Sequence, residues 1–233
     1  MTYLKQSDSH SFLLELRGVS MEYAGAGRVL EGVDLRIFGA GEFVVIRGRS
    51  GIGKSTLLRI AGLLEAPTSG EVYFNGLEGS KMNDGLLSRT RLREIGFVHQ
   101  QFNLIGALTC LENVELPMQI DHGRVSKEDA RKKAAELLKS LGLGDHLGKY
   151  PGELSVGQQQ RAAVARALSN DPRLIVADEP TSNLDEESAS LVLRCLLGRK
   201  ERCAVILSTT GADEEFPSTS EYRLSNGGRL APL

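Results

Sequence analysis

The sequence predicts a single α/β domain built around a mostly parallel sheet. Three observations predict it: short β-branched apolar runs, helical periodicity between two of these runs, and a glycine-rich turn directly after one of them. The chain has 233 residues, enough for one full hydrophobic core and short for two enzymatic domains. We therefore expect residues 12–233 to form one domain and residues 1–11 to be an N-terminal tail.

The composition excludes several classes of protein. Hydrophobic residues make up 41% and charged residues 25%, which excludes disordered, collagen-like and disulfide-rich scaffolds. The formal net charge of -2 provides no broad basic field, so we expect no nucleic-acid partner. The 3 cysteines form no C-x-x-C pair, the apolar runs are shorter than the roughly 18 residues of a membrane helix, and no secretory signal is visible. These features predict a cytoplasmic protein.

The elements follow in chain order from the spacing of apolar residues and glycines. Residues 12 to about 75 contain short alternating segments that indicate an antiparallel β layer. A helix is expected at 130–141, where apolar residues recur on one face, with Ser126 and Asp129 as its capping box. The last residues, from about 221, indicate a closing hairpin with Asn226 and Gly227 in its turn. Buried parallel strands are expected at 42–47, 95–99, 174–177 and 204–208.

The strand at 42–47 runs into a loop that matches the phosphate-binding pattern G-x-x-x-x-G-K-[ST]. Backbone N–H groups and the N-terminus of the next helix would surround the phosphate oxygens. Lys54 would neutralise the β/γ charge, and the Ser55 hydroxyl would bind Mg²⁺. The pattern predicts a nucleotide site made of Gly48, Arg49, Ser50, Gly51, Ile52, Gly53, Lys54, Ser55 and Thr56.

A pair of acids follows the strand at 174–177. Asp178 and Glu179 would lie at the carboxyl end of that strand, the edge where open α/β sheets bind ligands. We expect Asp178 to bind Mg²⁺ and Glu179 to be the general base that polarises an attacking water.

Further motifs make the chain resemble the ATP-binding subunits of ABC transporters from about residue 12 onward. Residues 154–161 read LSVGQQQR, which is similar to the LSGGQ signature of that family. The resemblance implies a P-loop NTPase core of the RecA-like type, with the antiparallel β layer and an inserted helical lobe at about 101–168 that carries the signature. It also implies that ATP and Mg²⁺ are held in a head-to-tail dimer. The signature residues that would cap the γ-phosphate of the opposite subunit are Ser155, Val156, Gly157 and Gln158.

Other positions match the family residue by residue. Tyr23 resembles its adenine-stacking aromatic, and Gln100 resembles the Q-loop glutamine that contacts Mg²⁺ and the attacking water. Asp185 resembles the D-loop acid at the dimer interface. Val156 replaces the first glycine of the signature, and we expect a helix start to tolerate this β-branched residue.

One departure concerns the switch histidine, which in the family hydrogen-bonds the γ-phosphate. After the strand at 204–207 this chain reads STTG, and all its histidines lie upstream, at His10, His99, His122 and His146. We assign Thr210 to the switch position as a catalytic residue; it donates one hydrogen bond and carries no charge. Losing a positioned donor costs roughly 10²–10³ in rate in other enzymes, so we expect ATP binding and dimer closure with weakened hydrolysis.

The segment at 102–117 resembles the ATPases of the macrolide-exporter and lipoprotein-release group. The resemblance implies a transmembrane permease that contacts residues 101–118 and holds the chain at the inner face of the cell membrane. Candidate contacts are Phe102, Leu104, Leu111 and Met118, and packing within the lobe is an equal alternative for each.

Two functions stay open at this point. The first is a subunit that energises transport, in which ATP closes the dimer and hydrolysis at Glu179 resets it. The second is a nucleotide-gated regulatory or mechanical module that moves a membrane partner without transport. The dimer is either a homodimer or a heterodimer with a second ATPase subunit. Chromosome and DNA-repair ATPases are excluded because only about 100 residues separate Lys54 from Ser155, too few for their coiled coil.

Overall fold

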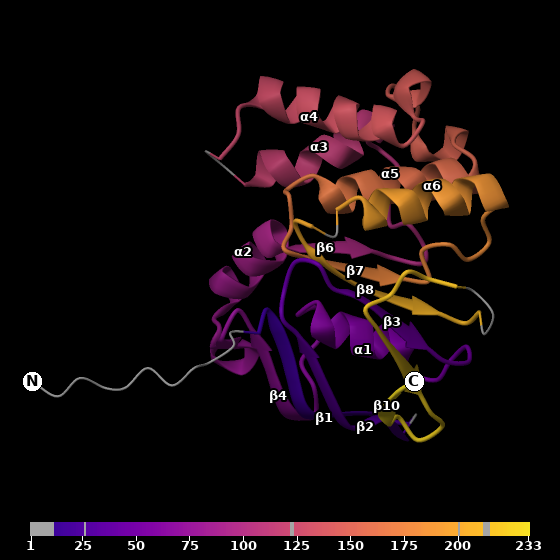
Figure 1. Ribbon diagram of the computed structural model, residues 1–233. Helices are drawn as coiled ribbons and strands as arrows, with labels where there is room; N and C mark the ends of the chain where they lie inside the picture. Colours follow the sequence, from indigo (N-terminus) through magenta and orange to yellow (C-terminus); the bar gives the residue numbers. More distant parts are fainter. Residues whose placement is uncertain (1–11, 26, 122–123, 200, 212–214) are drawn as a thin grey trace, which may run out of the picture.

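Two β-sheets enclose helix α1 (Lys54–Ala61), and a group of helices covers the outer face of the larger sheet (Figure 1). The computed structural model describes residues 12–233 except 26, 122–123, 200 and 212–214. The tail predicted at residues 1–11 lies outside the described residues. No helix in the described part of the chain is long and apolar enough to cross a membrane.

The larger sheet has 6 strands in the order β10-β9-β3-β8-β7-β6. Strands β9, β3, β8, β7 and β6 run parallel to their neighbours, and β10 pairs with β9 in the antiparallel direction. The carboxyl ends of β3, β6, β7 and β8 therefore meet at one edge, which is where ligands bind in sheets of this kind. The strands are β3 (Phe43–Arg47), β6 (Ile95–Val98), β7 (Leu174–Asp178), β8 (Ala204–Thr209), β9 (Ser220–Leu224) and β10 (Leu230–Pro232).

The smaller sheet has 4 antiparallel strands in the order β2-β1-β4-β5. Its strands come from the segment expected to form an antiparallel layer, and this prediction is confirmed. They are β1 (Leu14–Tyr23), β2 (Gly27–Ile37), β4 (Ser69–Phe74) and β5 (Leu77–Glu78). Apolar residues of this sheet, of α1 and of one face of the larger sheet form a continuous core. The phosphate loop is therefore anchored between two sheets.

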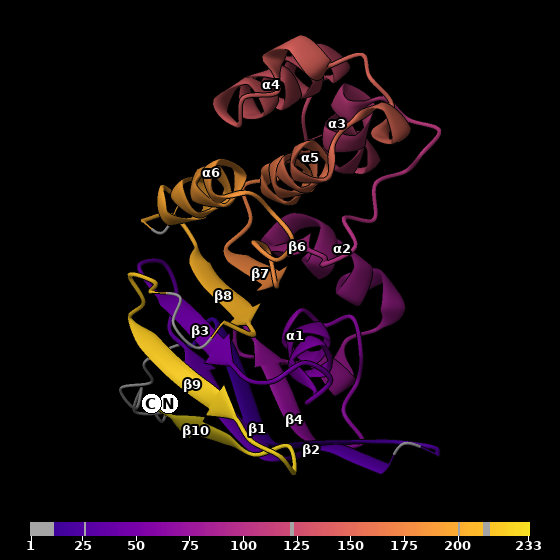
Figure 2. The same cartoon turned by 90° about the vertical axis from the view of Figure 1, so that its right-hand side faces the viewer.

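Helices α5 and α6 cover the other face of the larger sheet, and α3 and α4 pack on α5, on the side farthest from the smaller sheet (Figure 2). The helix expected at 130–141 is confirmed as α4, and Ser126 caps it by accepting from Asp129 N at 3.1 Å. Helix α2 was not predicted. None of its residues is buried, so its sequence shows no apolar residues at helical spacing. The helices are α2 (Asp84–Glu94), α3 (Cys110–Ile120), α4 (Lys127–Ser140), α5 (Val156–Leu168) and α6 (Glu186–Leu197), with the 3₁₀ turns η1 (Gly79–Lys81), η2 (Gly144–His146) and η3 (Pro151–Glu153).

Two of the candidate permease contacts are core residues. Leu111 is 6% exposed and Met118 is 2% exposed, and both pack with α4 and α5. Leu104 is partly buried against the same core, and Phe102 is half-buried. The packing alternative is therefore correct for Leu111 and Met118, which a partner cannot reach.

The β-hairpin expected near the end of the sequence is present. Strands β9 and β10 pair with Leu224 opposite Leu230, and Gly228 N donates to Ser225 O at 3.0 Å across the turn. Gly227 has a φ of 102°, a left-handed conformation that glycine adopts without strain.

Candidate functional site

The phosphate loop joins β3 to α1 and wraps around Lys54. The Lys54 side chain is 3% exposed, and its Nζ donates to Gly48 O at 2.8 Å and to Arg49 O at 3.0 Å. Gly53 is the N-cap of α1 with a φ of 111°, and a Cβ at this position would lie 2.7 Å from Val29 Cγ1. Only glycine fits at position 53. The glycine before the lysine in the pattern is therefore required both by the positive φ and by the lack of space for a side chain.

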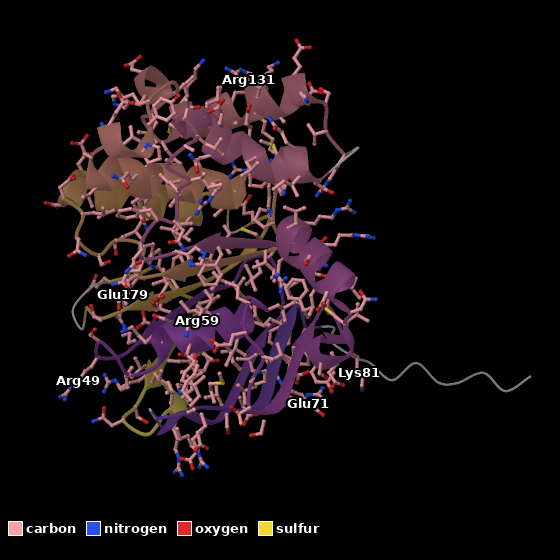
Figure 3. All side chains as sticks on the ribbon, turned by 180° about the vertical axis from the view of Figure 1, so that it is seen from behind. Arg49, Arg59, Glu71, Lys81, Arg131 and Glu179 are labelled. Carbon is pink, nitrogen blue, oxygen red and sulfur yellow. The ribbon has the colours of Figure 1, made fainter. Side chains whose placement is uncertain are left out.

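Glu179 is the point at which three predicted catalytic residues meet. Its Oε1 lies 3.1 Å from Lys54 Nζ, and its Oε2 accepts from Gln100 Nε2 at 3.3 Å. The three residues come from α1, from the end of β7 and from the segment after β6. Figure 3 shows Glu179 on the same side of the molecule as Arg49 of the phosphate loop. Glu179 has a φ of 45°, an uncommon conformation for a non-glycine residue that functional sites favour.

Ser208 holds both acids of the pair in place. Its hydroxyl donates to Asp178 Oδ1 at 2.7 Å and accepts from Glu179 N at 3.1 Å. Ser208 lies on β8, the strand next to β7, and is fully buried. The sequence did not identify this residue, because 30 positions separate it from Asp178 and no local pattern links them.

The donors available for a metal fit Mg²⁺ bound together with a nucleotide. Asp178 is 8% exposed at the end of β7, and Ser55 lies half-buried in the first turn of α1. Among the described residues no group of three or more His, Cys, Asp or Glu side chains is placed to hold a metal by itself. Mg²⁺ typically takes one or two carboxylates and completes its shell with phosphate oxygens and water. The Asp178 carboxylate and the Ser55 hydroxyl beside the phosphate loop fit this kind of Mg²⁺ coordination.

Tyr23 lies next to the start of α1 at the end of β1. Its hydroxyl donates to Glu65 Oε1 at 2.7 Å and accepts from Arg59 Nη2 at 3.0 Å. The same hydroxyl lies 3.4 Å from Thr56 Oγ1, directly after the phosphate loop. The ring is half-buried and its hydroxyl is fixed by these contacts, and the stacking of this ring on adenine stays a prediction.

The signature motif forms the capped start of α5. Ser155 Oγ accepts from Gln158 N at 3.3 Å, while Ser155 N donates to Gln158 Oε1 at 2.9 Å. This reciprocal capping box fixes the first turn of the helix. Val156 is the first helical residue and is 48% exposed, so its side chain is accommodated as expected.

The signature contacts the D-loop of the same chain through Gly157. A Cβ at position 157 would lie 2.7 Å from Ser188 Oγ, so the first turns of α5 and α6 touch. Asp185 is the N-cap of α6 and accepts from Ser188 N at 2.8 Å. This backbone hydrogen bond lowers the pKa of Asp185 below its usual value. The structure therefore brings Gly157 of the signature close to Asp185, whose Oδ2 would lie 3.6 Å from a Cβ at position 157.

Arg166 links α5 to the segment that follows Gln100. Its Nη2 donates to Phe102 O at 2.7 Å, and its Nη1 donates to Asn103 O. Phe102 and Asn103 have φ values of 57° and 50°, so the guanidinium stabilises a turn that is locally unfavourable. Burial lowers the pKa of Arg166. This residue was missed because its partners lie more than 60 positions away.

Two threonines follow Ser208 beside the phosphate loop. Thr209 is the last residue of β8, is 5% exposed, and its carbonyl accepts from Gly48 N at 3.3 Å. Thr210 is exposed and lines a cavity of about 410 Å³ together with Gly48 and Arg49. Strand β8 ends at Thr209, one residue later than expected. If the family order Thr-His-Asp is aligned directly after Leu207, Thr209 takes the position of the histidine. Both threonines are therefore candidates for the switch position.

Residues 30–182 match the family model described as ABC transporter. The chain belongs to this family. As an ABC-type ATPase it has the fold that the sequence predicted: a P-loop core, an antiparallel β subdomain and a helical lobe.

The similar ABC proteins come from archaea and bacteria. An uncharacterised ABC transporter ATP-binding protein of Methanocaldococcus jannaschii is 50% identical over 88% of this chain and 90% of its own length. The lipoprotein-releasing system ATP-binding protein LolD of Hyphomonas neptunium is 44% identical over 84% of this chain and 87% of its own length. The macrolide export ATP-binding/permease protein MacB 1/2 of Paracoccus denitrificans is 46% identical over 84% of this chain, which spans 30% of that protein.

A solved ABC structure has the same fold. The cassette MJ0796, in a dimeric post-hydrolysis state bound to ADP and Pi, superposes with a TM-score of 0.86 at 39% identity over 94% of this chain and 98% of its own. The resemblance to the macrolide-exporter and lipoprotein-release group is thus confirmed.

Proposed function

We propose that this chain energises a membrane transporter through ATP-driven head-to-tail dimerisation, with Glu179 as the general base of hydrolysis. The observation that carries the proposal is the meeting of Lys54 and Gln100 at the Glu179 carboxylate. The lysine ammonium is held by this carboxylate and by two loop carbonyls. Phosphate oxygens are stronger partners for the ammonium, so ATP would draw Lys54 away and leave Glu179 free to accept a proton from water.

The metal and the remaining nucleotide contacts complete this proposal. Ser55, Asp178 and Gln100 would hold Mg²⁺, which supplies charge neutralisation at the phosphates. The ring of Tyr23 would stack on adenine, with its hydroxyl held by Glu65 and Arg59. Ser208 keeps Asp178 and Glu179 oriented while the nucleotide changes.

The signature is proposed to act on the opposite subunit, with a permease as the membrane partner. Ser155 caps the start of α5 and donates its N–H to Gln158 Oε1, and the backbone N–H of Gly157 follows in the first turn, where a helix attracts phosphate. The relative MacB is described as an ATP-binding and permease protein. This description supports a permease partner for this chain as well. Ile105, which is 45% exposed, and the half-buried Phe102 belong to the part of the segment 101–118 that is available for that contact.

ATP is expected to convert the chain from monomer to dimer when hydrolysis is blocked. Light scattering of Glu179→Gln with ATP and Mg²⁺ should report twice the monomer mass, and ADP should leave a monomer. A monomer in both nucleotides would contradict ATP-driven homodimerisation of this chain. A dimer without turnover in the parent chain and without transport beside its permease would favour the regulatory module instead.

The switch position makes a separate prediction. If the missing histidine limits turnover, Thr210→His should raise the hydrolysis rate by roughly 10-fold or more, since a positioned donor at developing charge is worth 10²–10³ elsewhere. Thr209→His is the matched variant, because either threonine is a candidate for that position. Steady-state ATP hydrolysis of both variants decides between them, and unchanged turnover in both would show that hydrolysis does not depend on a switch histidine.

A further inference from the structure

The ring of His146 is tied to the signature motif through Gln158. His146 is the last residue of η2, and its backbone is fixed by His146 N donating to Leu143 O at 3.0 Å and by Lys149 N donating to His146 O at 3.1 Å. From this turn the ring Nε2 lies 3.0 Å from Gln158 Nε2. Gln158 is the same residue that forms the capping box with Ser155.

The capping box decides which atom of the Gln158 amide faces the ring. Ser155 N–H donates to Gln158 Oε1 at 2.9 Å, so the amide oxygen faces Ser155 and the amide NH₂ faces His146. An amide nitrogen only donates, so His146 Nε2 must be the acceptor and the ring proton is on Nδ1. Nδ1 is buried without a hydrogen-bond partner among the described residues. The ring is therefore held in its neutral form by one contact only.

We propose that His146 is a positioning residue of the signature motif and makes this motif sensitive to protons. A second proton on the ring places an N–H at Nε2, where it faces the donating NH₂ of Gln158. The amide then turns to offer its oxygen to the ring, and Ser155 N–H loses its acceptor. The capping box opens at the helix start that contacts ATP, a consequence that rests on the proposed action of the signature on the opposite subunit.

Few other groups compete for the ring. Arg161 of α5 donates to Gly157 O and Leu141 O, and Glu112 of α3 is engaged by Thr109. Histidine is the side chain whose ordinary titration falls between about pH 5 and 8, so the tests below compare pH 8 with pH 6. Five ionisable residues lie on the segments next to His146. Asp145 and Lys149 are beside it in the chain, and Lys139 of α4 and Arg161 of α5 pack against Gly144 and Gly142 of the same turn. Glu112 of α3 follows Leu111, whose N–H donates to Leu147 O.

The first test follows the Ser155 amide in the nucleotide-free chain by NMR of a ¹⁵N-labelled sample. Its chemical shift should follow the titration of the His146 ring nitrogens as the pH falls from about 8 to about 6. His146→Gln places a side-chain carbonyl near the Nε2 position and should remove this response. His99→Gln is the matched control at the other described histidine and should leave the response of Ser155 intact.

The second test measures the ATP concentration needed for half-maximal dimerisation in the Glu179→Gln background. With His146 present, this concentration should rise about 2- to 10-fold between pH 8 and pH 6, the effect expected for one hydrogen bond. His146→Gln should show a low value at both pH values, and His146→Leu a high value at both. A role in folding alone would lower the melting temperature of both variants without removing the pH dependence.

The results separate the two proposals. A Ser155 amide that ignores the ring titration, or a pH dependence of dimerisation that persists in His146→Gln, would overturn the role of His146. A Ser155 amide that follows the ring while no variant dimerises with ATP would leave the positioning role standing and reject the in-trans action of the signature.

Discussion

Replacing Glu179 by Gln should abolish ATP hydrolysis while ATP binding is retained. The amide has nearly the same size and keeps one oxygen for the Lys54 ammonium, but it cannot accept a proton from water. Removal of a general base typically costs about 10²–10⁴ in rate. Single-turnover hydrolysis and ATP affinity, both measured on the purified variant, check this expectation.

The control for this variant is Glu136→Gln, which removes an exposed carboxylate on α4 away from the site. It should leave hydrolysis and binding unchanged. Residual turnover of Glu179→Gln near the level of the parent chain would show that another group is the base, and a parallel loss of ATP affinity would show that Glu179 acts in binding.

Lys54→Ala should weaken ATP binding at least about 10-fold. Lys54 supplies the positive charge at the centre of the loop, where its ammonium is 3.1 Å from Glu179 and within hydrogen-bond distance of two carbonyls. Charge-assisted hydrogen bonds to phosphate contribute about 1.5–3 kcal/mol each, so the dissociation constant should rise at least about 10-fold. Equilibrium binding of a fluorescent ATP analogue measures this change.

Lys81→Ala provides the comparison, because Lys81 is an exposed lysine that pairs with Glu78 far from the phosphate loop. Its ATP affinity should equal that of the parent chain. Equal affinities of Lys54→Ala and the parent chain would mean that ATP does not bind at this loop.

The sequence predicts the catalytic edge well because its signals are local. The phosphate loop follows a buried strand within a few residues, and Asp178 and Glu179 directly follow another. The apolar period of α4 and the turn of the last hairpin are local in the same sense. The strands before the phosphate loop and the acid pair, helix α4 and the last hairpin therefore occur at the positions predicted from the sequence.

The missed residues act across long distances in the chain. Ser208 reaches Asp178 from the neighbouring strand, and Arg166 reaches a turn that no pattern marks. Helix α2 lacks a buried face, so periodicity has nothing to detect. Leu111 and Met118 look like any apolar residues in the sequence, and only the packing of α3 on α4 and α5 shows that they are core.

The most direct test of the account is to mix two inactive variants. Lys54→Ala loses the phosphate site, and Gly157→Asp disturbs the signature, where a Cβ would already lie 2.7 Å from Ser188 Oγ. If each site joins the phosphate loop of one subunit to the signature of the other, half of the randomly mixed dimers contain one intact site. Hydrolysis should then recover to about a quarter of the parent rate, because a head-to-tail pairing places both substitutions in one site of a mixed dimer and leaves its other site intact. A mixture as inactive as its components would contradict the head-to-tail dimer.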